Sequence, residues 1–397
     1  MITVAEAQAR CLALAAEVSL PSEQVPLADA AGRVLSAPAR ATRAQPPFSA
    51  SAMDGYAVAA TSVAPGDSFE VVAEAAAGHA WGGALKPGQA ARIFTGAPVP
   101  EGAHQVVIQE DVSRDGDRIT LLPSLGNGPN IRPLGADFGM DHSLTAPRRL
   151  GPAELALLAA MNVPEATVRM RPKVALLATG DELVMPGGNP GPDQIIASNV
   201  FALKAMIEAA GGEATIMPIA PDREDALQAI MEDMRFADLA VTIGGASVGD
   251  HDLVAKVGAR LGLEQSFYKI AMRPGKPLIA GQFGEGRPYL GLPGNPVSAI
   301  VCGYLFLVPM IRQMLGESDV LPAPLTARLA APVGANGPRA HYMRARMHEG
   351  TNGREVTAFD RQDSSLLTVL SEANCLLIRP AGDAAQPAGA AVTVLPT

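Results

Sequence analysis

Cysteine is scarce in this chain, which has only Cys11, Cys302 and Cys375 among 397 residues. An odd number of cysteines without a CxxC pair provides neither a disulfide framework nor a typical zinc site. The six histidines show no HExxH or other metal-ligand spacing. The sequence therefore argues against a disulfide-bonded secreted protein and predicts a protein of the reducing cytoplasm.

Long apolar runs and an excess of basic charge are also missing. The longest apolar run, AIVCGYLFLVPMI at 299–311, is shorter than the roughly 20 residues that span a bilayer. The N-terminus carries Glu6 early and lacks a basic start, which indicates an amphipathic helix rather than a signal peptide. The net charge is −9, whereas nucleic-acid phosphates require a basic face. We therefore expect a soluble protein with neither a membrane nor a nucleic acid as its partner.

Two familiar sets of catalytic parts are absent as well. The sequence contains no GxSxG nucleophile elbow in a strand–turn–helix context and no Walker loop. Acyl transfer and P-loop phosphoryl transfer therefore lack their usual residues.

Glycine and proline, in contrast, are plentiful, with 40 and 34 residues, and the length suits several domains rather than one core. The pattern is helical to about Arg43, β-like from Pro46, helical again at GPAELALLAAMNV, alternating strand and helix from Lys173, and β-like after Leu321. We predict an α/β multidomain protein with a parallel, doubly wound sheet. The predicted regions are an N-terminal helical linker domain (1–45 with 131–172), an inserted β-domain (46–130), an α/β domain (173–320) and a C-terminal β-domain (321–397).

The ends of four predicted strands should form a binding edge, because ligands of open α/β sheets bind beyond the carboxyl ends of the strands. These ends bring the segment 179–182, Asp222, the segment 244–252 and the segment 291–298 together. In GLPGNPVSA, Asn295 suits an N-cap and Pro296 the first helical turn, with Ser298 just inside. Free N–H groups there would bind an anion, although a well-capped core helix is the better interpretation of this motif alone.

Two further loops strengthen the prediction of an anion site. GGASVG offers a backbone cradle with Ser247 as hydroxyl donor, or equally a simple glycine turn. YKIAMRPGKP places Lys269, Arg273 and Lys276 in a proline-rich loop, which suits a phosphate or another oxyanion better than a surface charge cluster. Carboxylates occur on the same loops and are typical of a Mg²⁺ site next to phosphate. The alternative for some of them, Asp250 first, is that they cap helices and bind no metal. These carboxylates are Asp181, Glu182, Asp222, Asp250 and Asp252.

Nine motifs in their order along the chain resemble the molybdopterin molybdenumtransferase family (MoeA and the E domain of gephyrin). The resemblance covers nearly the whole chain and weakens after residue 321. It implies an elongated homodimer of four-domain subunits that ends in a C-terminal β-barrel. The motifs are PPFSASAMDGYAV, IFTGAPVPEGA, IRPLGADF, LGPAELALLAAMNV, LLATGDEL, SN, GGASVGDHD, RPGKP and GLPGNPVSA.

The implied reaction inserts molybdate into adenylylated molybdopterin and releases AMP with the help of Mg²⁺. The adenylyltransferase that supplies the pterin and the apo-molybdoenzymes that receive the product would be protein partners. Two alternatives remain: a CinA-like nucleotide pyrophosphatase on the same α/β module, and a non-catalytic molybdopterin carrier or scaffold.

The resemblance also assigns residues. The catalytic set is Asp54, Thr95, Asp137 (with Arg132 nearby), Glu182, Asp222 and Asp252, of which Glu182 and Asp252 would hold the metal. The substrate-binding set, which includes the strand-end residues, is Thr179, Gly180, Ser247, Lys269, Arg273, Lys276, Pro293, Asn295, Pro296 and Ser298. The alignment is loose at Arg344, Ser364 and Ser365.

Asp54 poses a separate question, because it lies in SAMDGYAV, where an Asp-Gly pair by itself indicates a turn. In the resembling family, the cavity of one subunit faces the β-domain of the other. We therefore expect Asp54 to be supplied in trans, with Gly55 setting the turn that orients it.

Overall fold

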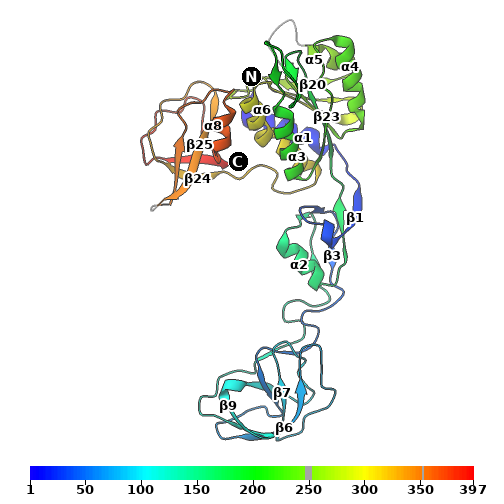
Figure 1. Ribbon diagram of the computed structural model, residues 1–397, viewed down its shortest axis with the longest axis vertical. Helices are drawn as coiled ribbons and strands as arrows, with labels where there is room; N and C mark the ends of the chain where they lie inside the picture. The colour runs from blue at the N-terminus through cyan, green and yellow to red at the C-terminus, as the bar shows by residue number, and fades with distance from the viewer. Residues whose placement is uncertain (246–252, 351–352) are drawn as a thin grey trace.

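The chain is elongated, with its regions arranged along one long axis (Figure 1). The computed structural model describes residues 1–245, 253–350 and 353–397. The α/β region and the C-terminal β-region lie side by side at one end, together with both termini. The inserted β-domain lies at the opposite end, and a narrow linker joins the two (Figure 1). The β-domain is therefore remote from the α/β region of its own chain.

The α/β region is built on one six-stranded sheet. Its strands are β15 (Lys173–Ala178), β18 (Glu213–Ile216), β19 (Leu239–Ile243), β20 (Glu264–Tyr268), β22 (Ile279–Phe283) and β23 (Arg287–Leu292). In space their order is β18-β15-β19-β23-β22-β20. The neighbours β18, β15, β19 and β23 are parallel, so their carboxyl ends meet at one edge.

Helices cover both faces of this sheet, as expected for a doubly wound domain. They are α1 (Val4–Ala16), α3 (Asn199–Ala210), α4 (Glu224–Asp233), α5 (Leu253–Arg260), α6 (Pro296–Cys302) and α7 (Val308–Met314). One core joins Leu176 and Val241 to α1, α3, α6 and α7, and a second core joins Ala175 and Leu177 to α4 and α5. Because successive residues of a strand point to opposite faces, the apolar run KVALLA supplies both cores.

The predicted doubly wound sheet is parallel in its four strands β18, β15, β19 and β23 but antiparallel at one edge. Strand β22 pairs antiparallel with β23, and β20 pairs antiparallel with β22. A single 3₁₀ turn, Gly284–Gly286, joins β22 to β23, and only antiparallel neighbours can be joined by so short a connection. The sheet is therefore mixed.

The apolar run at 299–311 belongs to a longer helix than the run alone indicates. Helices α6 and α7 are joined by a π-helical turn, Gly303–Leu307, into one 19-residue helix, Pro296–Met314. Its length and composition would suffice to cross a membrane, unlike the run itself. However, 72% of the most apolar window is buried inside the protein, as is usual for a core helix.

The first segment is helical only as far as Ala16, not to Arg43 as its pattern indicated. Helix α1 packs on the α/β core through Ala7, Cys11 and Ala15. Residues 22–26 then form a strand, because they pair antiparallel with residues 165–169 across a long sequence separation. The linker sheet consists of β1 (Ser22–Pro26), β14 (Glu165–Arg169), β2 (Val34–Leu35) and β13 (Arg148–Arg149).

Helix α2 (Pro152–Ala160) packs beside this linker sheet and begins as predicted. Pro152 occupies the first turn, where its missing N–H costs nothing. The carboxylate of Glu154 accepts a hydrogen bond from the Gly151 N–H (3.1 Å), which is one half of a capping box; Gly151 has no side chain to form the other half. Two short pairs lead toward the β-domain: β3 (Ala39–Arg40) with β12 (Ser143–Leu144), and β4 (Ala50–Ser51) with β11 (Ile131–Arg132).

The inserted region is an all-β domain, as predicted. Its six strands are β5 (Gly55–Val58), β6 (Ser68–Ala75), β7 (Gln89–Ile93), β8 (Gln105–Ile108), β9 (Val112–Asp115) and β10 (Arg118–Leu121). They follow the order β8-β5-β7-β6-β10-β9. Separate apolar clusters form around Val107 and around Val106, so both faces of the sheet are covered.

The C-terminal region is a closed β-barrel with one short helix, α8 (Leu367–Glu372). The barrel closes because β25 pairs with β26 along one side and with β27 along the other. A sixth strand, β21 (Met272–Arg273), extends from the α/β region and pairs in parallel with β25. The barrel strands are β24 (Leu325–Leu329), β25 (Ala340–Gly350), β26 (Gly353–Ala358), β27 (Cys375–Arg379) and β28 (Ala391–Pro396).

Candidate functional site

A cavity of about 1110 Å³ lies at the carboxyl ends of the parallel strands. The loops that follow β15, β19 and β23 contribute to it, as does Asp222. Most of the predicted substrate-binding residues of the described chain line this cavity. They are Thr179, Gly180, Lys269, Lys276, Pro293, Asn295, Pro296 and Ser298.

Backbone hydrogen bonds continue past the strand ends and draw these loops together. The Thr179 N–H donates to the Ile243 carbonyl (3.1 Å), and the Gly180 N–H donates to the Ala220 carbonyl (3.1 Å). The Gly244 N–H donates to the Leu292 carbonyl (3.1 Å). The floor of the cavity is therefore fixed by the sheet itself rather than by loose loops.

Gly180 is required by two features of its position. Its φ is +140°, a conformation that other residues rarely adopt. In addition, a Cβ at this position would lie 2.2 Å from Oε2 of Glu182, whose exposed carboxylate folds back over the glycine. The glycine thus makes room for the predicted metal ligand.

The start of helix α6 differs from the expected anion site in two respects. Asn295 occupies the N-cap position, but its side chain makes no capping hydrogen bond. The Val297 N–H donates to the Ser364 carbonyl (3.1 Å), so this group is not free to bind a ligand. Ser298 lies inside the first turn, only 4% exposed. What the helix start offers a ligand is its dipole and the Ser298 hydroxyl.

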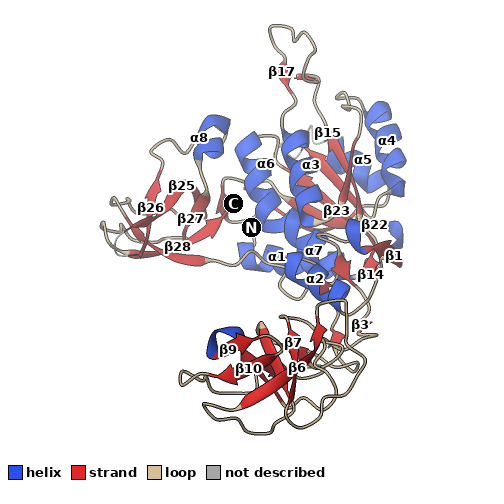
Figure 2. Cartoon of the chain, turned by 60° about the horizontal axis from the view of Figure 1, so that its bottom comes forward, coloured by secondary structure: helices blue, strands red, loops and turns tan. Residues whose placement is uncertain are grey.

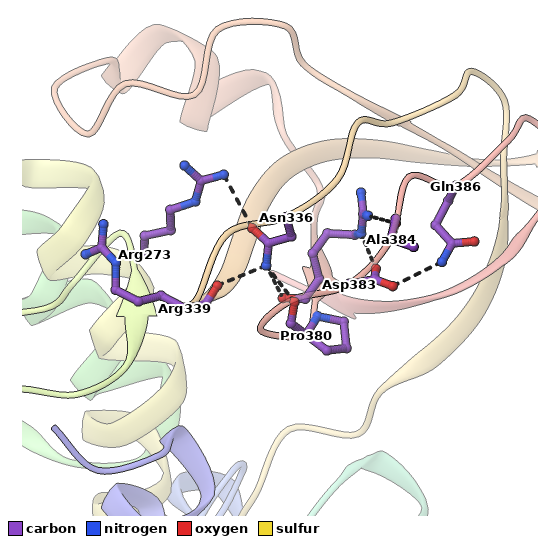
Figure 3. Close-up of polar contacts among 8 residues, drawn as sticks. Arg273, Asn336, Arg339, Pro380, Asp383, Ala384 and Gln386 are labelled. Carbon is purple, nitrogen blue, oxygen red and sulfur yellow. Dashed lines mark hydrogen bonds and ion pairs between the residues drawn. The ribbon is translucent and has the colours of Figure 1, made fainter.

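The three predicted basic residues separate into two groups. Lys269 and Lys276 line the cavity, and the Lys269 Nζ lies 4.5 Å from the centre of the Tyr268 ring. Arg273 does not line the cavity, because β21 carries it onto the barrel, where its Nη2 donates to Oδ1 of Asn336 (3.5 Å). Asn336 in turn donates to three carbonyls, those of Arg339 (2.9 Å), Arg379 (3.2 Å) and Pro380 (2.6 Å) (Figure 3).

The described carboxylates provide part of a metal site. Glu182 and Asp222 line the cavity, and Oδ1 of Asp181 accepts a hydrogen bond from the Asp222 N–H (3.0 Å). Within residues 1–245, 253–350 and 353–397, no three His, Cys, Asp or Glu side chains are grouped to hold a metal ion. The predicted Ser247 and Asp252, together with Asp250, fall outside the described residues.

The predicted residues Asp54 and Thr95 form a second, separate unit in the β-domain. Oδ1 of Asp54 accepts hydrogen bonds from both the backbone N–H and the hydroxyl of Thr95, each at 2.7 Å. These two bonds, and to a smaller degree the nearby Arg92, lower the pKa of the Asp54 carboxyl. Asp54 is thus more than a local turn former, since its side chain bonds a residue 41 positions away.

Arg92 holds the loop that carries Asp54, a role that sequence reasoning missed. Its Nη1 donates to the Gly55 carbonyl (3.0 Å) and its Nη2 to the side chain of Gln109 (2.7 Å). Its guanidinium also lies over the rings of Tyr56 and Phe94, at 5.2 and 4.6 Å. The Gln109 N–H donates to the Asp54 carbonyl (3.0 Å), which completes the connection.

The remaining predicted residues are scattered. Asp137 lies in the linker, exposed, with its N–H bonded to the Gln45 carbonyl (2.9 Å), and thus outside the α/β cavity. Ser365 of the barrel region does line the cavity. Arg344 is fully buried; its Nη2 donates to the Asp363 carbonyl (2.9 Å), and burial lowers its pKa.

Comparisons with known proteins match the whole chain to one group of enzymes. Family models match in order: the MoeA N-terminal region (domain I and II) at residues 2–162, the probable molybdopterin binding domain at 175–313, and the MoeA C-terminal region (domain IV) at 326–397. A molybdopterin molybdenumtransferase of Nostoc sp. is 36% identical over 94% of this chain and 88% of its own length. One of Haemophilus influenzae is 32% identical over 100% of this chain and 98% of its own.

The chain belongs to the molybdopterin molybdenumtransferase family. A crystal structure of the molybdopterin biosynthesis MoeA protein of Pyrococcus horikoshii is 30% identical, covers 100% of this chain and 99% of its own, and has a TM-score of 0.82. A second MoeA structure from the same organism, 24% identical over 100% of each chain with a TM-score of 0.84, supports the fold alone.

In this member of the molybdopterin molybdenumtransferase family, several cavity residues escaped prediction. Ser198 and Asn199 line the cavity, and Nδ2 of Asn199 donates to the Gly294 carbonyl (2.7 Å), which ties α3 to the loop after β23. Ile195 and Ile196 line it too. In the sequence, only the SN motif (Ser198 and Asn199) pointed to this part of the site. The nearby Ile195 and Ile196 had the pattern of an ordinary apolar pair.

Proposed function

We propose that this chain is a molybdopterin molybdenumtransferase that inserts molybdate into adenylylated molybdopterin and releases AMP. The single observation that carries this assignment is the cavity at the strand ends. It combines glycine-rich loops, two lysines and carboxylates in a chain matched along its length by enzymes of that name.

The residues of the cavity suit two substrates that repel each other. Adenylylated molybdopterin is a polyanion and molybdate is a dianion, so positive potential must offset their repulsion. Lys269 and Lys276 supply point charges, and the start of α6 supplies a helix dipole beside Ser298. The strand-end loops are held in place by backbone hydrogen bonds to the sheet, so little reorganisation is needed when the phosphates bind.

We propose Mg²⁺ as the metal, with two carboxylate ligands. Glu182 is one of them, and Asp252, which lies outside the residues that the structure describes, is the other. The oxygen chemistry of Glu182 and Asp222 in the cavity fits this ion, which commonly binds one or two carboxylates together with substrate phosphates. When bound, the ion would neutralise charge on the phosphoanhydride. The role of Gly180 is to leave room for the Glu182 carboxylate.

We further propose that the protein acts as a homodimer in which Asp54 reaches the cavity of the partner subunit. The supporting observation is the shape of the chain, whose β-domain and α/β cavity lie at opposite ends (Figure 1). The hydrogen bonds from Thr95 keep Asp54 ionised, so it would enter the site as a fixed negative charge.

Two alternatives have less support. A CinA-like pyrophosphatase would need only the α/β module, yet matches to molybdenumtransferases extend over the N-terminal and C-terminal regions. A non-catalytic carrier would not need the Asp54–Thr95 unit. We infer that the protein works in the cytoplasm, between an adenylyltransferase that supplies the pterin and the apo-molybdoenzymes that receive the product.

The test supplies purified protein with adenylylated molybdopterin, molybdate and Mg²⁺. We expect AMP release that depends on molybdate, and reconstitution of an apo-molybdoenzyme by the product. The variant Glu182→Ala should keep its melting temperature and lose turnover about a hundredfold or more, as expected for a residue that acts on the reacting groups. AMP release indifferent to molybdate, or a product that activates no apo-enzyme, would refute the assignment.

A further inference from the structure

A small ribbon, residues 183–197, projects from the α/β domain (Figure 2), and residues at its base line the cavity. Its two strands, β16 (Leu183–Val184) and β17 (Ile195–Ile196), pair in parallel, and the Ile195 N–H donates to the Glu182 carbonyl (2.7 Å). The Gln194 side chain ties its base by donating to the Asp181 carbonyl (3.2 Å) and accepting from the Gly191 N–H (3.0 Å). The ribbon is therefore a defined element with its own hydrogen bonds.

The ribbon presents apolar side chains to the cavity and to solvent at the same time. Ile195 is 59% exposed and Ile196 is 40% exposed, and both line the cavity. By contrast, Val200 and Ile243, which also line it, are almost fully buried, at 1% and 3%. Two neighbouring branched apolar side chains left in water at a cavity indicate a surface that a ligand or partner covers.

The cavity thus has two chemically different parts. The strand-end loops bring glycine backbone, Lys269 and Lys276, which suit phosphate oxygens. The ribbon brings only aliphatic side chains into the lining, and phosphate would lose hydration there without gaining a hydrogen bond. A ligand that fills both parts must carry an apolar surface joined to a phosphate.

We propose that Ile195 and Ile196 form the contact surface for a flat nitrogen heterocycle of the substrate, whose phosphate lies on the strand-end loops. This inference rests on the proposed function, because that substrate carries two such rings, an adenine and a pterin, joined through phosphates. The faces of these rings are apolar while their edges form hydrogen bonds. Branched aliphatic side chains therefore suit the faces of the rings and leave the edges to polar groups.

The test compares ligands that share a phosphate and differ in the ring. Calorimetric affinities are measured for AMP, for ribose 5-phosphate, which lacks a ring, and for neopterin phosphate. The variant Ile195→Thr keeps the β-branch but shortens the side chain by its terminal methyl group and adds a hydroxyl group, so it removes apolar contact surface. It should weaken a ring-bearing ligand about tenfold, the usual scale of a lost apolar contact, and leave ribose 5-phosphate unchanged. Weakening of AMP alone assigns the ribbon to adenine, and weakening of neopterin phosphate alone assigns it to the pterin.

Met185 offers a matched control on the same ribbon, since it is 39% exposed and is not among the lining residues. Met185→Thr should leave all three affinities unchanged. Unchanged ring affinities in Ile195→Thr, or an equal loss for ribose 5-phosphate, would overturn the inference. A changed oligomeric state in light scattering with unchanged affinities would overturn it too, because a second copy would then cover the ribbon.

Lys276→Ala separates this inference from the proposed function. It should weaken all three ligands, because each carries the phosphate that the lysine neutralises. If Lys276→Ala changes nothing while Ile195→Thr still weakens AMP or neopterin phosphate, the ring surface stands and the phosphate assignment fails. If the native protein binds none of the three ligands, both fail.

Discussion

The inserted β-domain and the α/β domain each contribute to the proposed active site, but they are built in opposite ways. In the β-domain, Asp54 is held by two hydrogen bonds from Thr95, and Arg92 fixes the loop around it. In the α/β domain, the site is a large cavity framed by backbone, and Glu182 is exposed above a glycine. One region supplies a fixed charge, and the other supplies volume and donors, so each lacks what the other has.

The largest effect on activity should come from removing one carboxylate from each domain, in separate variants. Asp54→Ala and Glu182→Ala should each lower turnover about a hundredfold or more, because each removes a carboxylate from the reacting region. If the halves belong to different subunits, a heterodimer of the two variants has one intact site of two. Such heterodimers, co-expressed with two affinity tags and purified through both, should recover about half of the native activity per dimer.

The contradicting result is a heterodimer as inactive as its parents. It would place Asp54 and Glu182 in one site of one chain, or remove Asp54 from the chemistry. A homodimer of the double variant, prepared in the same way, provides the background rate.

A smaller effect should follow from Gly180→Ala, which tests the backbone-framed half. The substitution places a methyl group on the Glu182 carboxylate and strains a φ of +140°, so kcat should fall about tenfold through displacement of Glu182. Gly187→Ala is the matched control, since Gly187 also has a positive φ, +89°, but open space around its Cβ. Equal losses in the two variants would show that backbone strain, rather than the position of Glu182, matters.

The α/β half could be predicted in large part from the sequence, because buried strands that alternate with helices direct their carboxyl ends to one edge. Thr179, Lys276 and Ser298 meet there for that reason. The antiparallel edge was missed because an apolar run such as IAGQF carries no information about strand direction. Arg273 was misplaced because β21 pairs with a strand of the barrel about seventy residues later, and local pattern does not encode that pairing.

The contacts of the β-domain half could not be read from local sequence at all. Asp54 meets Thr95 because β5 and β7 pair with Gly55 opposite Ile93, which places the residue before one strand beside the residues after the other. An Asp-Gly pair gives no sign of such a register. The resemblance to a family named both residues, but it did not show that they bond each other.

The smallest expected effect is on the pKa of Asp54, the fixed charge of the β-domain, and it tests how that charge is held. Thr95→Val removes the hydroxyl bond but keeps the backbone bond, which is the larger cause of the lowered Asp54 pKa. The pKa should therefore rise but stay below its ordinary value of about 3.9. A carboxyl pKa that is lower in the folded state stabilises the fold above the unfolded-state pKa, and this stabilisation is lost as pH falls through the folded-state pKa. Since Thr95→Val raises the folded-state pKa, its loss of stability in acid should begin at a higher pH than in the native protein.

Carboxyl-carbon NMR titration of Asp54 measures this shift directly, with Thr95→Ser as the variant that keeps the hydroxyl and should not change the pKa. Arg92→Gln removes the weakest of the three causes and should raise the pKa less than Thr95→Val does. If Arg92→Gln has the larger effect instead, Arg92 rather than Thr95 fixes the ionisation of Asp54, through its charge or through the loop that it holds. The Asp54 charge would then depend on this wider network, and the contrast with the backbone-framed cavity would be weaker.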